Sequence, residues 1–179
     1  MQLIPAILRG FQTISAIIVL GISVNLARGQ NPRADDSSVP PATGYAAFCG
    51  GFGVLVALIG VASLFASFLE GVVMWALDGL SGVTMLASGI AYAVLLKDTS
   101  CGNYATTWDH RLLSGGCQQR DGTKYCNFDA HESKSRCVSA KADNAFMFIS
   151  FVACVAIVGF SVLRRRGGGG GGKAGVNYA

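Results

Sequence analysis

Asp78 is an acidic residue in the middle of a long apolar stretch, a setting that makes its carboxyl group chemically unusual. Between residues 46 and 96 the charged residues are Glu70 and Asp78. A carboxylate in apolar surroundings is costly, so it either moves protons or ions or bonds to a neighbouring helix. A pathway needs further ionisable groups at the same depth, and the apolar stretches offer no Lys, Arg or His. We therefore predict a polar contact between helices. The candidate partners at that depth are Gln12, Ser15 and Ser63.

Cysteines form the second group of residues with possible chemistry. Four of the six lie in the polar segment 97–143, namely Cys101, Cys117, Cys126 and Cys137. Clustered cysteines in a segment exposed to an oxidising compartment predict two disulfides. In the cytosol the same four, with His110 and His131, could instead bind zinc. No two of these cysteines form a C-x2-C or C-x4-C pair, which favours the disulfides.

Catalytic and cofactor-binding patterns are not found in the sequence. Asp109 and His110 are adjacent, but no Ser or Cys stands at a spacing that would make it their nucleophile. The six glycines at 167–172 are not followed by the Lys-Ser/Thr pair of a phosphate-binding loop, so they predict a flexible spacer. We expect no enzyme activity, no metal and no cofactor.

Length and composition identify the elements that must position these residues. Only 13% of the 179 residues are charged, about half the usual share for a soluble domain. The apolar run at 144–163 has about 20 residues, enough to cross a bilayer as a helix. A shorter run covers 11–27. The stretch 46–96, with about 51 residues, is too long for one span and predicts two, 46–68 and 71–96, with a turn at Glu70.

The sequence thus predicts an all-α protein, a four-helix transmembrane bundle with a disulfide-containing outer loop between spans three and four. A soluble helical bundle would alternate polar and apolar helix faces, whereas these segments are apolar all round. Residues 1–29 also fit a cleaved signal peptide, with small residues Ala27 and Gly29 near a cleavage point. Cleavage would leave the sidedness of the remaining chain unchanged.

Positive charge predicts the orientation in the membrane. Arg164, Arg165 and Arg166 follow the fourth span directly, and such residues stay on the cytoplasmic side. We expect a cytoplasmic N-terminus at 1–10, a membrane domain at 11–163 with its outer loop at 97–143, and a cytoplasmic tail at 164–179. The three arginines are expected to contact anionic lipid headgroups. A nucleic-acid partner is not expected, because the basic cluster adjoins an apolar run.

Four cysteines allow three disulfide connectivities, and the expected spans favour one of them. Cys101 lies about five residues beyond span three, and Cys137 lies about seven residues before span four. Adjacent helices are 8–10 Å apart, so these two cysteines start close together. We expect a Cys101–Cys137 bond with a Cys117–Cys126 bond nested inside it.

Two stretches resemble a known family. They are WALDGLSGVTMLASGIAYAVLL, at 75–96, and RCVSAKADNAFMFISF, which leads into the fourth span. Together with the four spans, they resemble fungal MARVEL-domain proteins, the tetraspan group that includes the non-classical export protein, over residues 7–166. The resemblance implies a four-helix membrane bundle with both termini cytoplasmic. The positions that match its pattern are Asp78, Cys137, Lys141, Ala145 and Phe146.

The same resemblance implies a function without catalysis. We expect an integral protein of the plasma membrane, or of endomembrane vesicles, that organises membrane microdomains or vesicle traffic through helix and lipid contacts. Small residues in spans two and three would let helices approach closely and could also support self-association. The alternative is a small channel, transporter or accessory subunit in which Asp78 lines a polar path. The two functions differ in what should surround Asp78. An organiser would have a dry contact between helices there, whereas a channel or transporter would have a water-filled cavity.

Overall fold

The computed structural model describes residues 3–30, 40–63, 72–108, 110, 112–126 and 128–168. Four long helices make up most of it: α1 (Leu3–Arg28), α2 (Pro41–Ser63), α3 (Val72–Leu96) and α5 (Ala130–Gly168). Between α3 and α5 come the single-turn helix α4 (Tyr104–Thr107) and the strands β1 (Cys117–Arg120) and β2 (Thr123–Cys126). The predicted turn at Glu70 lies outside the described residues.

Each long helix contains a segment long and apolar enough to cross a membrane. These segments are Ala6–Arg28, Pro41–Ser63, Val73–Leu96 and Ala130–Leu163. The faces that point away from the bundle carry large apolar side chains such as Ile14, Leu55 and Val152, which are more than half exposed. An apolar outer surface is what a lipid environment requires. The predicted all-α bundle of four spans is confirmed.

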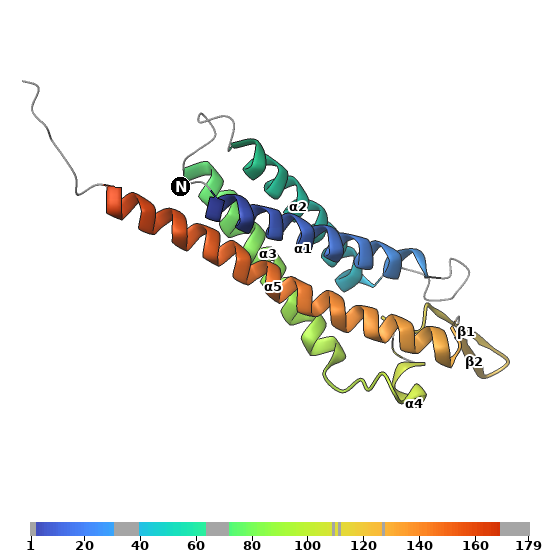
Figure 1. Ribbon diagram of the computed structural model, residues 1–179. Coiled ribbons are helices and arrows are strands. Elements are labelled where there is room, and N and C mark those ends of the chain that lie inside the picture. Colours follow the sequence, from blue (N-terminus) through green and yellow to red (C-terminus); the bar gives the residue numbers. More distant parts are fainter. Residues whose placement is uncertain are drawn as a thin grey trace, which may run out of the picture.

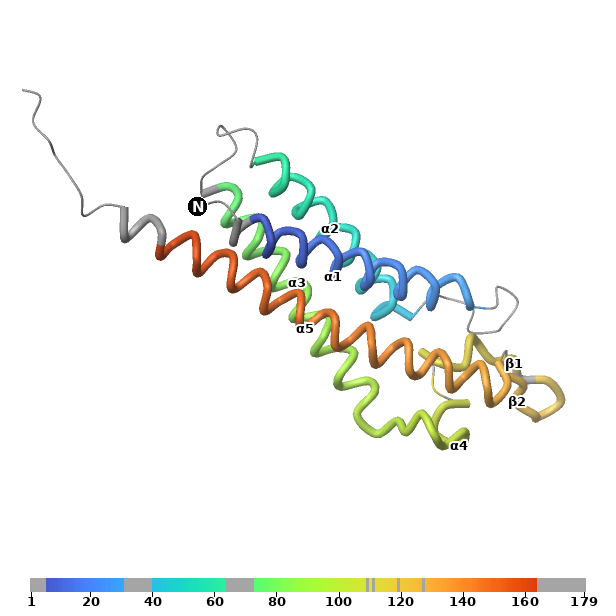
Figure 2. The backbone as a smooth tube through the Cα atoms, viewed as in Figure 1, coloured from blue at the N-terminus to red at the C-terminus, as the bar shows by residue number. Residues whose placement is uncertain are grey.

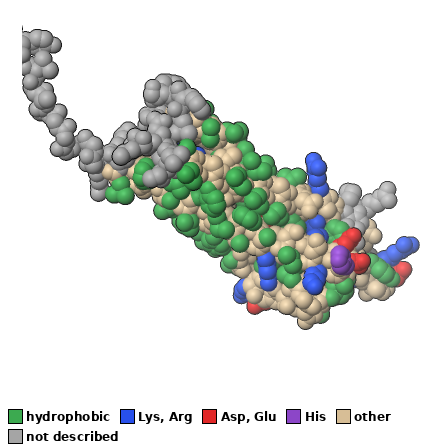
Figure 3. All heavy atoms as spheres, viewed as in Figure 1, with side chains coloured by type: hydrophobic (Ala, Val, Ile, Leu, Met, Phe, Trp, Pro, Cys, Tyr) green, Lys and Arg blue, Asp and Glu red, His purple; other side chains and the backbone are tan. Residues whose placement is uncertain are grey.

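The helices are arranged so that each packs against two others. Helix α1 packs against α2 and α5, and α3 packs against the same two helices. The start of α1 and the end of α5 lie at one end of the bundle, while α4, β1 and β2 lie at the other (Figures 1 and 2). On the face drawn in Figure 3, apolar side chains cover the bundle and charged ones gather at the end with the strands.

Close packing explains the small residues of spans two and three. A Cβ atom at Gly53 would lie 2.8 Å from the Met85 side chain, and one at Gly82 would lie 3.0 Å from Cys154. Helices α1 and α2 also approach closely, because a Cβ at Gly50 would lie 2.7 Å from the backbone nitrogen of Leu20. These glycines therefore serve contacts inside the bundle.

Helix α5 begins earlier than the sequence analysis expected. Residues 130–143 were assigned to the outer loop, but they form the first turns of α5. Asp129 starts the helix, because its carboxylate accepts a hydrogen bond of 2.9 Å from the Glu132 backbone N–H. The sequence signal was an Asp followed three residues later by Glu. This stretch buries Ser133, Cys137 and Ala140 and exposes His131, Glu132 and Lys134, so it is amphipathic rather than apolar.

A small polar cap covers the end of the bundle where the charged residues gather. We define the cap as residues 97–129 without 109, 111 and 127. Its strands pair antiparallel from Cys117 opposite Cys126 to Arg120 opposite Thr123. The Asp121-Gly122 turn between them has two positive φ angles, 51° and 76°, as a two-residue hairpin requires. Leu112 and Leu113 anchor the cap in the hydrophobic core beside Leu26 and Leu96.

Candidate functional site: a buried ion pair across the helix bundle

Asp78 lies six residues into α3, and its side chain is completely buried. The guanidinium of Arg9, on α1, donates two parallel hydrogen bonds to its carboxylate. Nη1 bonds to Oδ1 and Nη2 to Oδ2, both at 2.5 Å. This bidentate geometry is the strongest contact that an arginine and a carboxylate can form. The Arg9 side chain is itself nine-tenths buried, so the pair is shielded from solvent.

The identity of this partner corrects the sequence analysis. Arg9 was placed in a cytoplasmic segment outside the first span, and the spans were expected to offer no cation. In the structure α1 begins at Leu3, so Arg9 lies almost two turns inside the helix. Its side chain faces inward because residues 9, 12, 16, 19, 23 and 26 form one buried face at helical spacing. That spacing was the signal that would have placed Arg9 in the bundle.

The residues around the pair come from all four spans. Gln12 accepts a bond of 3.2 Å from Arg9 Nη1 and donates one of 3.3 Å to the Cys154 sulfur on α5. Gly60, on α2, makes room for the guanidinium, since a Cβ there would lie 2.7 Å from its central carbon. We call Arg9, Gln12, Gly60, Asp78 and Cys154 the ion-pair cluster.

Ser15 and Ser63 were also predicted as partners of Asp78, but both oxygens of its carboxylate are bonded to Arg9. Ser15 is buried on α1, and Ser63 donates to the Gly60 carbonyl oxygen of its own helix at 2.8 Å. Within the described residues no group of three or more His, Cys, Asp or Glu side chains could hold a metal ion. The ion-pair cluster therefore joins residues of all four spans. Both oxygens of the Asp78 carboxylate are already bonded to a cation, the Arg9 guanidinium.

A second polar contact joins α1 and α5 near the cap. The Ser23 hydroxyl donates a hydrogen bond of 2.7 Å to Asp143 Oδ2, and both side chains are completely buried. Sequence reasoning missed Asp143 because it assigned this residue to the loop. The helical spacing from Cys137 and Ala140 to Asp143 and Met147 was the available signal.

Arg136 makes a further connection between α5 and α1. Its Nη2 donates a bond of 2.6 Å to the carbonyl oxygen of Leu26, in the last turn of α1. A cation at a helix C-terminus satisfies a carbonyl that has no partner within the helix. The Phe128 ring packs over the guanidinium, 4.6 Å from its carbon. This residue was also missed, because it too was assigned to the loop.

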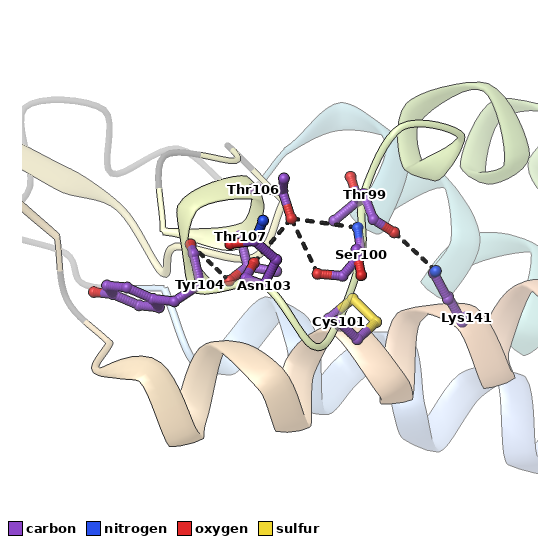
Figure 4. The surroundings of a disulfide bond; sticks show 9 residues. Thr99, Ser100, Cys101, Asn103, Tyr104, Thr106, Thr107 and Lys141 are labelled. Carbon is purple, nitrogen blue, oxygen red and sulfur yellow. Dashed lines mark hydrogen bonds between the residues drawn. A yellow bond between two sulfur atoms is a disulfide. The ribbon is translucent and has the colours of Figure 1, made fainter.

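The four clustered cysteines form two disulfides, Cys101–Cys137 and Cys117–Cys126. This is the connectivity that the sequence favoured. The first bond ties the segment after α3 to α5, and the second closes the β-hairpin. Lys141 donates a bond of 2.8 Å to the Thr99 carbonyl beside the first disulfide, while Thr106 bonds to the Ser100 backbone (Figure 4). Cys49 and Cys154 are buried free thiols, as expected of packing residues.

The three tail arginines lie on the last turns of α5, which ends at Gly168. Their side chains are outside the described residues, so their predicted lipid contacts stay a prediction. Helix α5 is 39 residues long, longer than a bilayer requires. Its two ends therefore project beyond the apolar part of the bundle.

Comparison with known proteins gives one match. The family model for MARVEL, a membrane-associating domain, matches residues 2–160. No curated protein and no solved structure matches the chain. The matched region contains the four spans up to the last turns of α5, both disulfides and the ion-pair cluster.

Proposed function

Since the chain belongs to the MARVEL family of membrane-associating domains, we propose that it organises membranes laterally, through helix and lipid contacts and without catalysis. It is a multi-pass membrane protein, because it joins four membrane-length helices to this family's domain. The proposed setting is the plasma membrane or trafficking vesicles, with the cap outside and both termini in the cytoplasm. Its proposed partners are bilayer lipids, further copies of the chain and other membrane proteins.

The pairing of Asp78 is the observation that carries this proposal. A channel or transporter that used Asp78 would need its carboxylate open to water and free to exchange a proton or ion. Both carboxylate oxygens are instead bonded to Arg9, and the side chain has no exposed surface. Releasing the carboxylate would leave a guanidinium unpaired in the bundle. The pair therefore favours a fixed scaffold over a conducting path.

The outer surface supports a lateral role. All four spans present apolar side chains outward, while the polar groups of the ion-pair cluster point inward. The proposed contact with anionic lipid comes from Arg164, Arg165 and Arg166. Clustered basic residues at the cytoplasmic surface attract such lipids by about 1 kcal/mol per residue.

The test is a pair of measurements on the full chain reconstituted in liposomes that contain phosphatidylserine. Proton and sodium flux should equal that of protein-free liposomes, for the wild type and for Asp78→Asn. Energy transfer between labelled copies should exceed the value for random mixing at the same density. Wild-type flux that Asp78→Asn abolishes without loss of folding would replace this proposal with the transport function. Energy transfer equal to the value for random mixing would contradict the part of the proposal that concerns self-association.

A further inference from the structure

Asp143 is a buried carboxylate whose charge the protein does not balance. It is fully buried in α5 and accepts one hydrogen bond, from Ser23. Within the described residues, ion pairs join Arg9 to Asp78 and Lys97 to Asp98, and none includes Asp143. Arg136 lies two turns earlier on the same helix, but it donates to the Leu26 carbonyl. An unpaired buried charge is among the costliest features a fold can carry.

Further oxygen atoms converge on this carboxylate. The Tyr92 hydroxyl on α3 lies within reach of the side chains of Thr43 on α2 and Ser23 on α1, and it is close enough to Asp143 to be affected by its charge. Asp143 Oδ1, the Tyr92 hydroxyl and the Thr43 hydroxyl are all buried, and no described group is in hydrogen-bond geometry with them. Leaving such a group unsatisfied costs about 1–3 kcal/mol. Apart from the bond between Ser23 and Asp143, these oxygen atoms have no partner among the described residues, which points to a bound species that bridges them.

We propose that Ser23, Thr43, Tyr92 and Asp143 bind a monovalent metal cation of the sodium class. Carboxylate and hydroxyl oxygens are hard ligands, which suit hard cations. A single carboxylate matches one positive charge, whereas calcium sites usually combine several carboxylates. A water molecule would provide hydrogen bonds for the oxygen atoms but would leave the negative charge of Asp143 unbalanced. A proton on Oδ1 would cancel the charge and allow one hydrogen bond to a neighbouring oxygen, but it would not bridge all four side chains. A cation does both.

The position of the site gives the cation a structural effect. Each of its four side chains comes from a different span: Ser23 from α1, Thr43 from α2, Tyr92 from α3 and Asp143 from α5. Ser23 and Tyr92 lie near the ends of α1 and α3, next to the cap, whereas Arg9 and Asp78 lie near the starts of the same two helices. Binding to the folded bundle alone stabilises it by an amount that grows with the logarithm of the cation concentration above the Kd. The cation thus joins the four helices at one end, as the ion-pair cluster does at the other.

The experiment measures radioactive sodium binding and thermal unfolding of the full chain in detergent. Sodium chloride is compared with choline chloride at equal ionic strength and pH. We expect saturable binding of about one ion per chain and a higher Tm in sodium, by several degrees. Asp143→Asn should weaken binding roughly tenfold or more, because it removes the charged ligand. Thr43→Val removes a hydroxyl ligand with little change in shape and should weaken binding as well.

Thr84→Val is the matched control, because the Thr84 hydroxyl bonds within α3, to the Ser81 carbonyl at 2.9 Å. It should bind sodium like the wild type. If Asp143→Asn does not fold, Thr43→Val and Tyr92→Phe decide the question. Absence of saturable binding, or the same Tm in sodium and choline, would overturn the site. So would unchanged binding in Thr43→Val and Tyr92→Phe.

Discussion

Arg9 and Asp78 are 69 positions apart in the sequence, yet two hydrogen bonds of 2.5 Å join them inside the bundle. The pair links α1 to α3, two helices that do not form one of the main packing pairs. Its position between α2 and α5 explains why Gly60 of α2 adjoins it and why Cys154 of α5 is reached through Gln12.

Breaking the ion pair should destabilise the bundle more than the loss of an ordinary hydrogen bond between helices. Asp78→Asn removes the negative charge and leaves the Arg9 guanidinium buried, which costs about 3–5 kcal/mol in soluble proteins. The double variant Arg9→Met with Asp78→Leu should recover much of that loss, because neither charge remains. Unfolding of the wild type, Arg9→Met, Asp78→Leu and the double variant in detergent provides the four free energies of a double-mutant cycle. Asp98→Asn, an exposed acid, is the control, and additive effects would refute the coupling.

Gly50 should be far less tolerant than its neighbour Gly51. A Cβ at Gly50 would lie 2.7 Å from the Leu20 backbone nitrogen, and backbone cannot move aside. A Cβ at Gly51 would have its nearest neighbour 3.9 Å away. We expect Gly50→Ala to lower the free energy of unfolding by about 1–3 kcal/mol. Gly51→Ala should change it by less than about 0.5 kcal/mol. Equal effects would show that α1 and α2 do not approach this closely.

The two disulfides should contribute unequally to stability. Cys101–Cys137 closes a separation of 36 residues and Cys117–Cys126 one of 9. By the chain-entropy relation, replacing the first pair with alanine should cost about 4 kcal/mol and replacing the second about 2.5 kcal/mol. Mass mapping without reductant should find both bonds, with Cys49 and Cys154 alkylated only after denaturation. Four alkylatable thiols in the native cap would point to a reducing compartment instead.

Both termini should lie on the cytoplasmic side and the cap outside. Four spans return the chain to the side where it began, and Arg164, Arg165 and Arg166 indicate that this side is inside. Trypsin added to intact cells should cleave at exposed cap or α5 sites such as Lys97 and Lys134. Tags on either terminus should survive. Digestion of the C-terminal tag from outside would reverse the orientation.

Replacing the three tail arginines with glutamine should weaken clustering in anionic membranes. The expected loss is about 1 kcal/mol of lipid attraction for each arginine. Removing three exposed cations from the opposite end is the matched control: Arg28→Gln, Lys97→Gln and Lys134→Gln. Fluorescence imaging of labelled protein in giant vesicles with and without phosphatidylserine measures the difference. Equal clustering in the two triple variants would exclude a role specific to the tail.

Sequence alone was sufficient for the features that depend on single segments of the chain, such as the length of an apolar run or the distance of a cysteine from a helix end. The number of spans follows from the length of each apolar run, because a bilayer has a fixed thickness. The disulfide connectivity followed from how close Cys101 and Cys137 stand to helix ends. The start of α5 could also have been found, since Asp129 and Glu132 form a recognisable helix start. Its first turns are amphipathic, so they lack the unbroken apolar run that marks a membrane span.

Only the tertiary structure decided which polar residues meet. The partner of Asp78 depends on how α1 and α3 are rotated about their axes and offset along the membrane. Those two quantities are set by side-chain packing along the whole length of the helices, at contacts such as Gly50 against Leu20. The same reason placed Ser23, Thr43, Tyr92 and Asp143 together. Periodicity indicates that a residue faces inward, but the residue opposite it is chosen by the packing of four helices at once.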